Sequence, residues 1–81
     1  MNDSKFKILM SSDVNYNELC AEIFFNDQFV CIVTQEEGLE NAKITISPPE
    51  GGGSWLFSLL EFESILKSAK NALWEMRKIS E

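Results

Sequence analysis

Apolar and polar residues alternate over short stretches of the first 58 positions. Such alternation predicts β-strands, because successive side chains along a strand point to opposite faces of a sheet. Prolines, glycines and small polar residues interrupt the alternation at several places, as they do between strands. The pattern predicts strands within residues 5–10, 18–25, 29–35, 43–47 and 55–58.

Asn26 and Asp27 stand between the second and third predicted strands. Both residue types tolerate the left-handed backbone of a two-residue hairpin turn. A turn at these positions predicts three cross-strand pairs: Phe25 with Gln28, Ile23 with Val30, and Ala21 with Ile32. One face of the hairpin then carries Leu19, Ala21, Ile23, Phe25, Val30 and Ile32, and the other carries Cys20, Glu22, Phe24, Phe29, Cys31 and Val33. Because both faces are mainly apolar, the hairpin either lies centrally in the sheet or leaves its second face for a partner.

From Leu59 to about Arg77 the apolar residues follow the 3.6-residue period of an α-helix. Ser58 precedes this segment and Glu61 lies three residues further on, which is the capping-box pattern of a helix start. We expect one apolar stripe of this helix to pack against the sheet. It consists of Phe62, Ile65, Leu66, Ala69, Leu73 and Met76.

Strands followed by a single helix predict an α+β fold. We expect an antiparallel sheet of four to five strands with one C-terminal α-helix packed on one face. The 81 residues suffice for one small domain and no linker divides them, so residues 1–81 are expected to form a single domain. The stretch PPEGGGS (48–54) is expected to be a loop, since its prolines and glycines disfavour regular structure.

The net charge of −6 is unevenly distributed. Residues 1–58 contain nine Asp and Glu against three Lys, whereas the four acidic and four basic residues of 59–81 cancel. An acidic surface repels nucleic acid and attracts basic partners. A moderate negative charge also keeps a small protein soluble without any binding function. Charge therefore argues against nucleic acid as a partner and leaves a basic partner open.

The chain has no histidine, which removes the commonest general acid–base residue and with it the Ser-His-Asp and Cys-His arrangements. Two cysteines without histidine do not make a zinc site, and Cys20 and Cys31 lie within apolar strands as small hydrophobic residues. The glycine-rich loop lacks the lysine of a phosphate-binding loop. The sequence thus predicts a protein that is not an enzyme and that uses no metal or cofactor.

Two groups of residues are candidates for binding a partner. Glu36, Glu37 and Glu40 form an acidic loop after the third strand, beside the second face of the hairpin. Leu60 and Trp74 lie on the flank of the helix, away from its apolar stripe. Trp74 either packs over a sheet edge or is an exposed anchor of the kind enriched in interfaces. Together these residues describe a binding surface better than an active site.

Three segments together resemble a known family: LCAEIFFNDQFVCIVTQEEG (19–38), KITISPP (43–49) and LLEFESILKSAKNAL (59–73). In the order of their strands, turn and helix they resemble small immunity proteins of bacterial polymorphic-toxin systems, including those of contact-dependent growth inhibition. The resemblance implies a bacterial, cytoplasmic protein that binds one cognate toxin C-terminal domain, often a nuclease, and neutralises it. An acidic inhibitor would complement the basic active site of a nuclease.

Two functional hypotheses remain. The first is an immunity protein that neutralises a toxin by acidic surface complementarity. The alternative is a small regulatory or self-associating interaction module with no toxin partner, and weak homo-oligomerisation is compatible with either. The N-terminus has no signal-peptide pattern, and no apolar run reaches the roughly 20 residues that cross a bilayer. We therefore expect a cytoplasmic protein without membrane contact.

Overall fold

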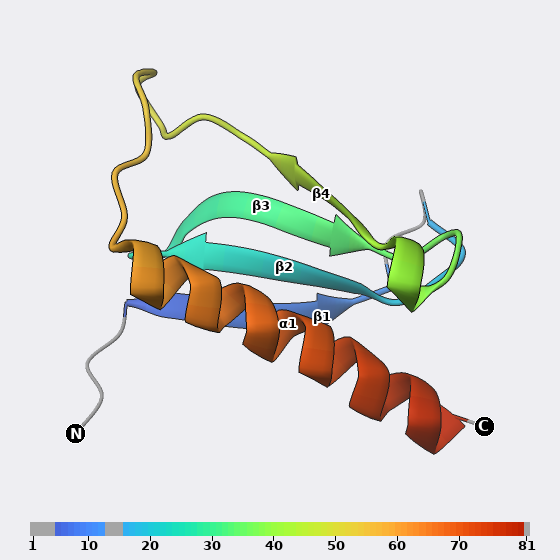
Figure 1. Cartoon of the computed structure of the whole chain (residues 1–81). Coiled ribbons are helices and arrows are strands. Elements are labelled where there is room, and N and C mark those ends of the chain that lie inside the picture. Colours follow the sequence, from blue (N-terminus) through green and yellow to red (C-terminus); the bar gives the residue numbers. More distant parts are fainter. Residues whose placement is uncertain (1–4, 13–15, 81) are drawn as a thin grey trace.

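The computed structural model describes residues 5–12 and 16–80 and confirms the α+β fold. Four antiparallel strands form one sheet in the order β1-β2-β3-β4, and a single helix crosses one face of it (Figure 1). A short 3-10 turn, η1, precedes the last strand. The elements are β1 (Phe6–Ser11), β2 (Cys20–Phe25), β3 (Gln28–Thr34), η1 (Leu39–Asn41), β4 (Lys43–Ile46) and α1 (Leu59–Ser80).

The two-residue turn of the central hairpin is confirmed. Asn26 and Asp27 have positive φ angles of 52° and 66°, which is the backbone of a turn whose twist matches that of the flanking strands. Phe25 lies opposite Gln28, as predicted. The Asn26 N–H donates a hydrogen bond to the Lys5 carbonyl at 3.1 Å, so the turn is also tied to the chain just before β1. The hairpin β2–β3 therefore lies in the middle of the sheet.

The rest of the predicted pairing is wrong, because β3 contains a β-bulge. Ile23 lies opposite Cys31 and Ala21 opposite Val33, so Val30 is an extra residue in the ladder. Val30 and Cys31 are both fully buried in the core. A bulge directs two successive side chains to the same face of the sheet. After the bulge, the side chains alternate again, but each lies on the face opposite to the one it would occupy in a regular strand.

This shift exchanges the faces of every β3 residue from Cys31 onward. Cys31 and Val33 face α1, and Ile32 lies on the opposite face, contrary to the prediction. Cys20, opposite Ser11 in β1, stays on that opposite face. The two cysteines thus lie on different sides of the sheet, and both are buried as reduced thiols.

The predicted strand within 55–58 is not formed. The segment is extended but pairs with no strand among the described residues. Its alternation reflects packing against rings instead: Trp55 and Phe57 turn inward, and Leu56 is exposed. Phe57 lies 4.9 Å from Phe6 and 5.2 Å from Phe62, measured between ring centroids. The segment therefore crosses the end of the sheet and closes the core there.

The helix begins at Leu59 as predicted and runs three residues beyond the predicted end at 77. The Ser58 hydroxyl oxygen accepts a hydrogen bond from the Glu61 N–H at 3.3 Å, which is an N-cap. Ala69 and Leu73 are fully buried, and the partly buried Phe62, Ile65 and Leu66 pack against the same core. Met76, predicted on this stripe, is largely exposed.

The helix covers β1 and β2 and touches η1, but it leaves β4 uncovered (Figure 1). The register places Ile44 and Ile46 on the helix side of the sheet, opposite Val33 and Cys31. Their side chains are nevertheless 41% and 56% exposed. The core therefore lies between α1 and the first three strands, and β4 forms an exposed edge.

Candidate partner-binding surfaces

The acidic loop after β3 is partly structural. The Glu36 carboxylate accepts hydrogen bonds from the N–H groups of Asn17 at 3.0 Å and Glu18 at 2.8 Å. Next to it, the buried Gln35 side chain donates from Nε2 to the Leu19 carbonyl at 2.9 Å. These bonds fix the connection between β1 and β2 to the end of β3. Glu36 is therefore an exposed side chain that stabilises the fold by hydrogen bonds. Its position in the sequence does not indicate this role.

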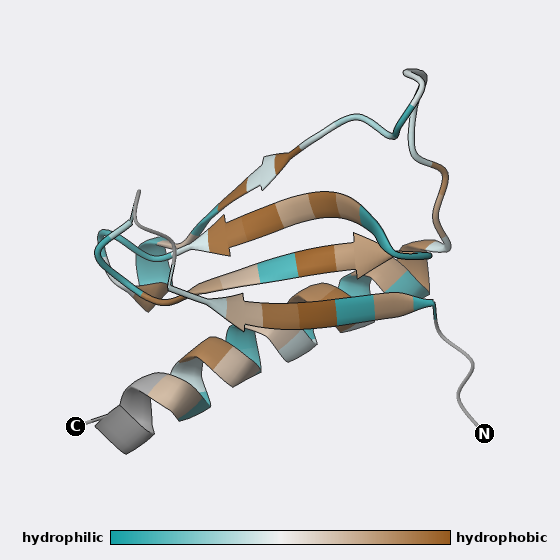
Figure 2. Ribbon diagram, turned by 180° about the vertical axis from the view of Figure 1, so that it is seen from behind, coloured by the Kyte–Doolittle hydropathy of each residue, from teal (hydrophilic) through white to brown (hydrophobic). Residues whose placement is uncertain are grey.

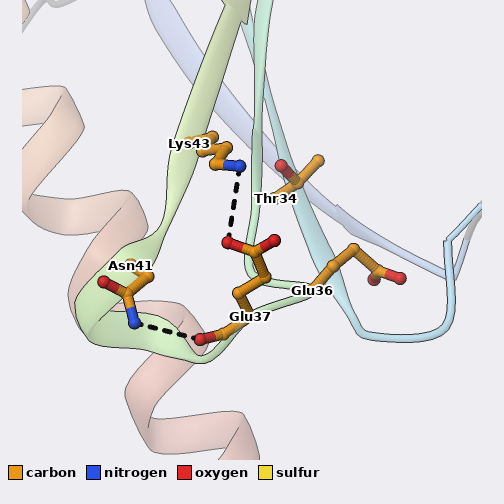
Figure 3. A pocket seen from close by; sticks show the side chains of 5 residues that line it. All are labelled: Thr34, Glu36, Glu37, Asn41 and Lys43. Carbon is orange, nitrogen blue, oxygen red and sulfur yellow. Dashed lines mark hydrogen bonds and ion pairs between the residues drawn. The ribbon is translucent and has the colours of Figure 1, made fainter.

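Glu37 and Glu40 are the other two acidic residues of this loop. The Glu37 carboxylate lies 3.4 Å from Lys43 Nζ in an exposed ion pair, and the Asn41 side chain donates to the Glu37 carbonyl at 3.2 Å. Figure 3 shows the Glu36 carboxylate directed away from this pair. Glu40 is exposed on η1. Together with Glu18, these carboxylates make one end of the sheet acidic.

A small hollow lies at this acidic end. Its volume is about 140 Å³, well below the roughly 300 Å³ at which small-molecule pockets begin. It suits a few water molecules better than a substrate. The lining residues are Thr34, Glu36, Glu37, Asn41 and Lys43 (Figure 3).

Leu60 and Trp74 do not form one patch. Their side chains are 74% and 52% exposed. Fourteen residues separate them along α1, which corresponds to about 21 Å at 1.5 Å per residue. They are therefore two separate exposed apolar side chains near opposite ends of the helix.

The most extensive candidate surface is the face of the sheet opposite α1, which we call the open face. No element of the described ranges 5–12 and 16–80 lies across it (Figure 2). Its centre is apolar: Leu9 is 53% exposed, and the rings of Phe24 and Phe29 meet edge to face at 5.7 Å. Ile32, which the bulge turns to this side, completes the group.

One carboxylate stands in the middle of the open face. Glu22 on β2 lies directly between Leu9 of β1 and Ile32 of β3. The side chain is partly buried, and Glu22 Oε2 accepts a hydrogen bond from the Ser11 hydroxyl at 2.9 Å. A carboxylate has about four lone pairs that can accept hydrogen bonds. Ser11 uses one of them, so a donor on a partner could bind to the others. The arrangement is a carboxylate held by Ser11, with the exposed Leu9 on one side and the partly buried Ile32 on the other.

Sequence reasoning found this face only in outline. The alternation indicated a mainly apolar second face with Glu22 as its charge, but it assigned Cys31 and Val33 to that face and Ile32 to the core. The apolar run from Phe29 to Val33 is compatible with a bulge, but it fits a strand that is apolar on both faces equally well, so it does not locate the extra residue.

A second hollow, which is mainly apolar, lies on the helix side of the sheet, between α1 and β4. Its volume is about 210 Å³, and its walls include Ile44 from β4 and Leu66 from α1. Lys43 and Lys70 stand at its rim. The hollow is present because α1 does not cover β4.

The described residues contain no group of three His, Cys, Asp or Glu side chains placed to hold a metal ion. Burial raises the pKa of the Cys31 thiol to about 11, so at neutral pH it is protonated and is a poor nucleophile. Within the same residues, no helix has the length and apolar character needed to cross a membrane.

The fold defines a class: a small α+β domain with a four-stranded antiparallel meander, one helix on one face, and an open second face. Comparison of the chain with protein-family models, curated proteins and solved structures found no match.

Proposed function

We propose that the protein is an immunity protein that binds and neutralises a cognate bacterial toxin domain, and that the open face is its contact surface. The observation that carries the proposal is Glu22, a carboxylate held by Ser11 between the exposed Leu9 and the partly buried Ile32 on an uncovered sheet face. Binding energy in interfaces concentrates in such places, where an apolar surround excludes water from a central polar contact. A partner that inserts an Arg or Lys here pairs with Glu22 and covers Leu9 and Phe29.

The charge distribution supports a basic partner. The net charge is −6, and Glu18, Glu37 and Glu40 are exposed at one end of the sheet, with Glu40 on η1, which contacts α1. Charges at the rim of an interface mainly accelerate association, whereas a charge at the centre mainly affects dissociation. Glu22 would accordingly hold the partner, and the acidic end would attract it.

A nuclease toxin domain has the matching chemistry, because its active site must bind the phosphates of a nucleic acid with basic side chains. The resemblance of the three sequence segments to immunity proteins supports the same partner. In this proposal the protein acts in the bacterial cytoplasm as a stoichiometric inhibitor, with no catalytic activity of its own and no nucleic-acid or membrane contact. A standard interface would cover roughly 800 Å² of its surface.

The first test is to identify a toxin with a variable C-terminal domain in the neighbouring upstream gene and to co-express that domain with this protein. Cells that express both proteins should grow, and cells that express the toxin domain alone should not. Isothermal titration of the two purified proteins should then give a one-to-one complex. Growth arrest despite co-expression, together with no heat of binding, would show that the protein is not the inhibitor of that toxin.

The second test asks whether Glu22 is the central contact. Glu22→Gln removes the charge and keeps an oxygen that accepts from Ser11, so the fold should persist. Loss of a buried charge pair typically costs 2 kcal/mol or more, so affinity should fall roughly 30-fold or more through faster dissociation. Glu63→Gln on the exposed side of α1 removes the same charge elsewhere and should bind normally. Equal affinities for both variants would assign the contact to another surface.

The third test concerns the acidic end. Glu37→Lys with Glu40→Lys reverses two exposed charges and leaves Glu36, which accepts hydrogen bonds from two backbone N–H groups, in place. Association with the toxin domain should slow, most strongly at low salt, while the melting temperature changes little. An unchanged association rate at both low and high salt would remove this end from the encounter.

One observation favours the alternative, a self-associating module without a toxin partner. It is the edge strand β4, where Ile44 and Ile46 are 41% and 56% exposed.

A further inference from the structure

The outer edge of β4 presents unpaired backbone groups. The Ser47 N–H donates to the Val30 carbonyl at 2.8 Å, so Ser47 bonds toward β3. In an antiparallel ladder the N–H and C=O of one residue point to the same side, and successive residues alternate. Thr45 and Lys43 therefore also bond toward β3, and the N–H and C=O groups of Ile44 and Ile46 point outward. No strand of the described residues pairs with that edge.

The side chains at this edge are also exposed. Ile44 and Ile46 are 41% and 56% exposed on the helix side, because α1 lies over β1 and β2. Proteins usually protect a sheet edge with charges, prolines or a covering segment. Here β4 begins with Lys43, and Pro48 follows two residues after its end, but the Ile-Thr-Ile remainder of the strand is unprotected. An added strand would thus gain hydrogen bonds and apolar contact together.

We propose that a second copy of this chain pairs with this edge, β4 against β4, about a two-fold axis at Thr45. In this antiparallel register Ile44 lies opposite Ile46 of the second copy, and Ile46 opposite its Ile44. Both outward-facing residues of each copy are then paired, giving four hydrogen bonds between the copies. Thr45 faces its own equivalent across the axis, on the open-face side.

The neighbouring symmetric registers are worse. A shift toward the start of β4 places Ile46 opposite Ala42, whose N–H is already bonded to the Leu39 carbonyl at 3.1 Å. A shift the other way places Ile44 opposite Pro48, which has no N–H. Only the register centred on Thr45 uses every outward group of the strand.

Side-chain chemistry favours the same register. The two lysines do not face each other, because Lys43 lies opposite Ser47 of the second copy. Threonine pairs are favourable between adjacent strands. The four isoleucines, two from each copy, meet on the helix side and cover one another. The contact is isologous, so it closes as a dimer and does not propagate.

The other edge of the sheet offers less. The helix-side residues of β1 are already covered, and Phe6 is only 7% exposed. A strand added to β1 would gain backbone hydrogen bonds but bury little further apolar surface there. Self-association through β4 therefore has the larger driving force.

In the dimer the two sheets join into one of eight strands, with both helices on the same side. The hollow beside Ile44 and Leu66 then becomes part of a trough between the two helices. Both open faces remain free, so the dimer neither needs nor excludes the proposed toxin contact. Its test uses the protein alone and is independent of the proposed function.

Cysteine cross-linking tests the register. Directly opposed residues without mutual hydrogen bonds have Cα atoms about 4.5 Å apart, within the range of a disulfide. Thr45→Cys should therefore form a disulfide-linked dimer under mild oxidation, and both native cysteines are buried. In the Lys43→Cys dimer the two introduced thiols, one from each copy, are offset by four residues along the paired strands. They lie roughly 13 Å apart and should cross-link poorly. Equal cross-linking of the two variants would overturn the register.

Sedimentation equilibrium tests the dimer itself. The average mass of the unmodified protein should rise from monomer toward dimer with increasing concentration. Thr45→Lys places two like charges on the axis and should restore the monomer, whereas Ser64→Lys on the exposed side of α1 should not. Monomer at every concentration up to about 1 mM, or a dimer that Thr45→Lys leaves intact, would overturn the proposal.

Hydrogen exchange of the unmodified protein provides a readout that no substitution can confound. The Ile44 and Ile46 amides should exchange more slowly as the concentration rises, while the inward Thr45 amide should change little. Exchange at Ile44 and Ile46 that is independent of concentration in a dimerising sample would place the interface elsewhere.

Discussion

Leu73 offers the most direct test of how the helix holds the sheet. Its side chain is fully buried in the cluster that also contains Ile23 and Val30. Leu73→Ala removes three carbons, and at roughly 0.8 kcal/mol for each the lost burial alone amounts to about 2.4 kcal/mol. The cavity left behind adds to this, and Leu→Ala substitutions at such sites cost about 2.7–5 kcal/mol. We expect a loss of about 3–4 kcal/mol.

Such a loss is large for this chain. A domain of 81 residues has a total stability of roughly 4–12 kcal/mol at the usual 0.05–0.15 kcal/mol per residue. Urea unfolding followed by circular dichroism measures the change, and the melting temperature should fall by more than about 10 °C. Leu60→Ala, the same substitution at an exposed position of the same helix, should change stability by no more than about 0.5 kcal/mol. Similar losses for the two variants, or a loss below about 1 kcal/mol at Leu73, would refute the placement of the helix.

Three further predictions concern single contacts. Glu36→Ala should cost about 1 kcal/mol in urea unfolding, because two backbone N–H groups lose their acceptor; a loss no larger than that of Glu40→Ala would contradict its anchoring role. Trp55→Phe keeps the ring stack but removes the 2.6 Å hydrogen bond from Trp55 Nε1 to the Ser47 carbonyl, and a loss of about 1 kcal/mol is expected by the same assay. The Cys31 thiol has its pKa raised by burial from 9.0 to about 11, so its contribution to stability is complete below pH 9 and is lost as the pH rises toward 11. Urea unfolding between pH 8 and pH 11 should show this decline in the unmodified protein and a smaller one in Cys31→Ala.

The helix and the central turn were predictable because each has a local cause. Ser58 and Glu61 specify the helix start within four residues, and Asn26-Asp27 specifies a two-residue turn by backbone preference alone. The bulge at Val30 was not predictable in this way. Its position depends on how the strand packs under α1, and a single extra residue exchanges the two faces for everything after it.

The prediction of a fifth strand at residues 55–58 was wrong for a related reason. Alternation at Trp55 and Phe57 indicates that one side of an extended chain is buried, but it does not reveal whether another strand lies alongside. In the structure an aromatic cluster provides the burial. Of the candidate site residues, Glu37, Glu40, Leu60 and Trp74 are exposed as a binding role requires. Glu36 is exposed as well, and its hydrogen bonds to the Asn17 and Glu18 N–H groups could not be predicted because these residues lie 19 and 18 positions away in the sequence.

The order of the strands has a consequence for how the chain folds. Every strand pairs with its neighbour in sequence, so the sheet can assemble by short loop closures, each with a modest entropy cost. The contact of α1 with β1 is different, because it joins the two ends of the described chain. We expect the sheet to form first and the helix to dock after the rate-limiting step. Stopped-flow measurements on Leu73→Ala should then show faster unfolding with nearly unchanged refolding; slower refolding would place the helix in the folding nucleus.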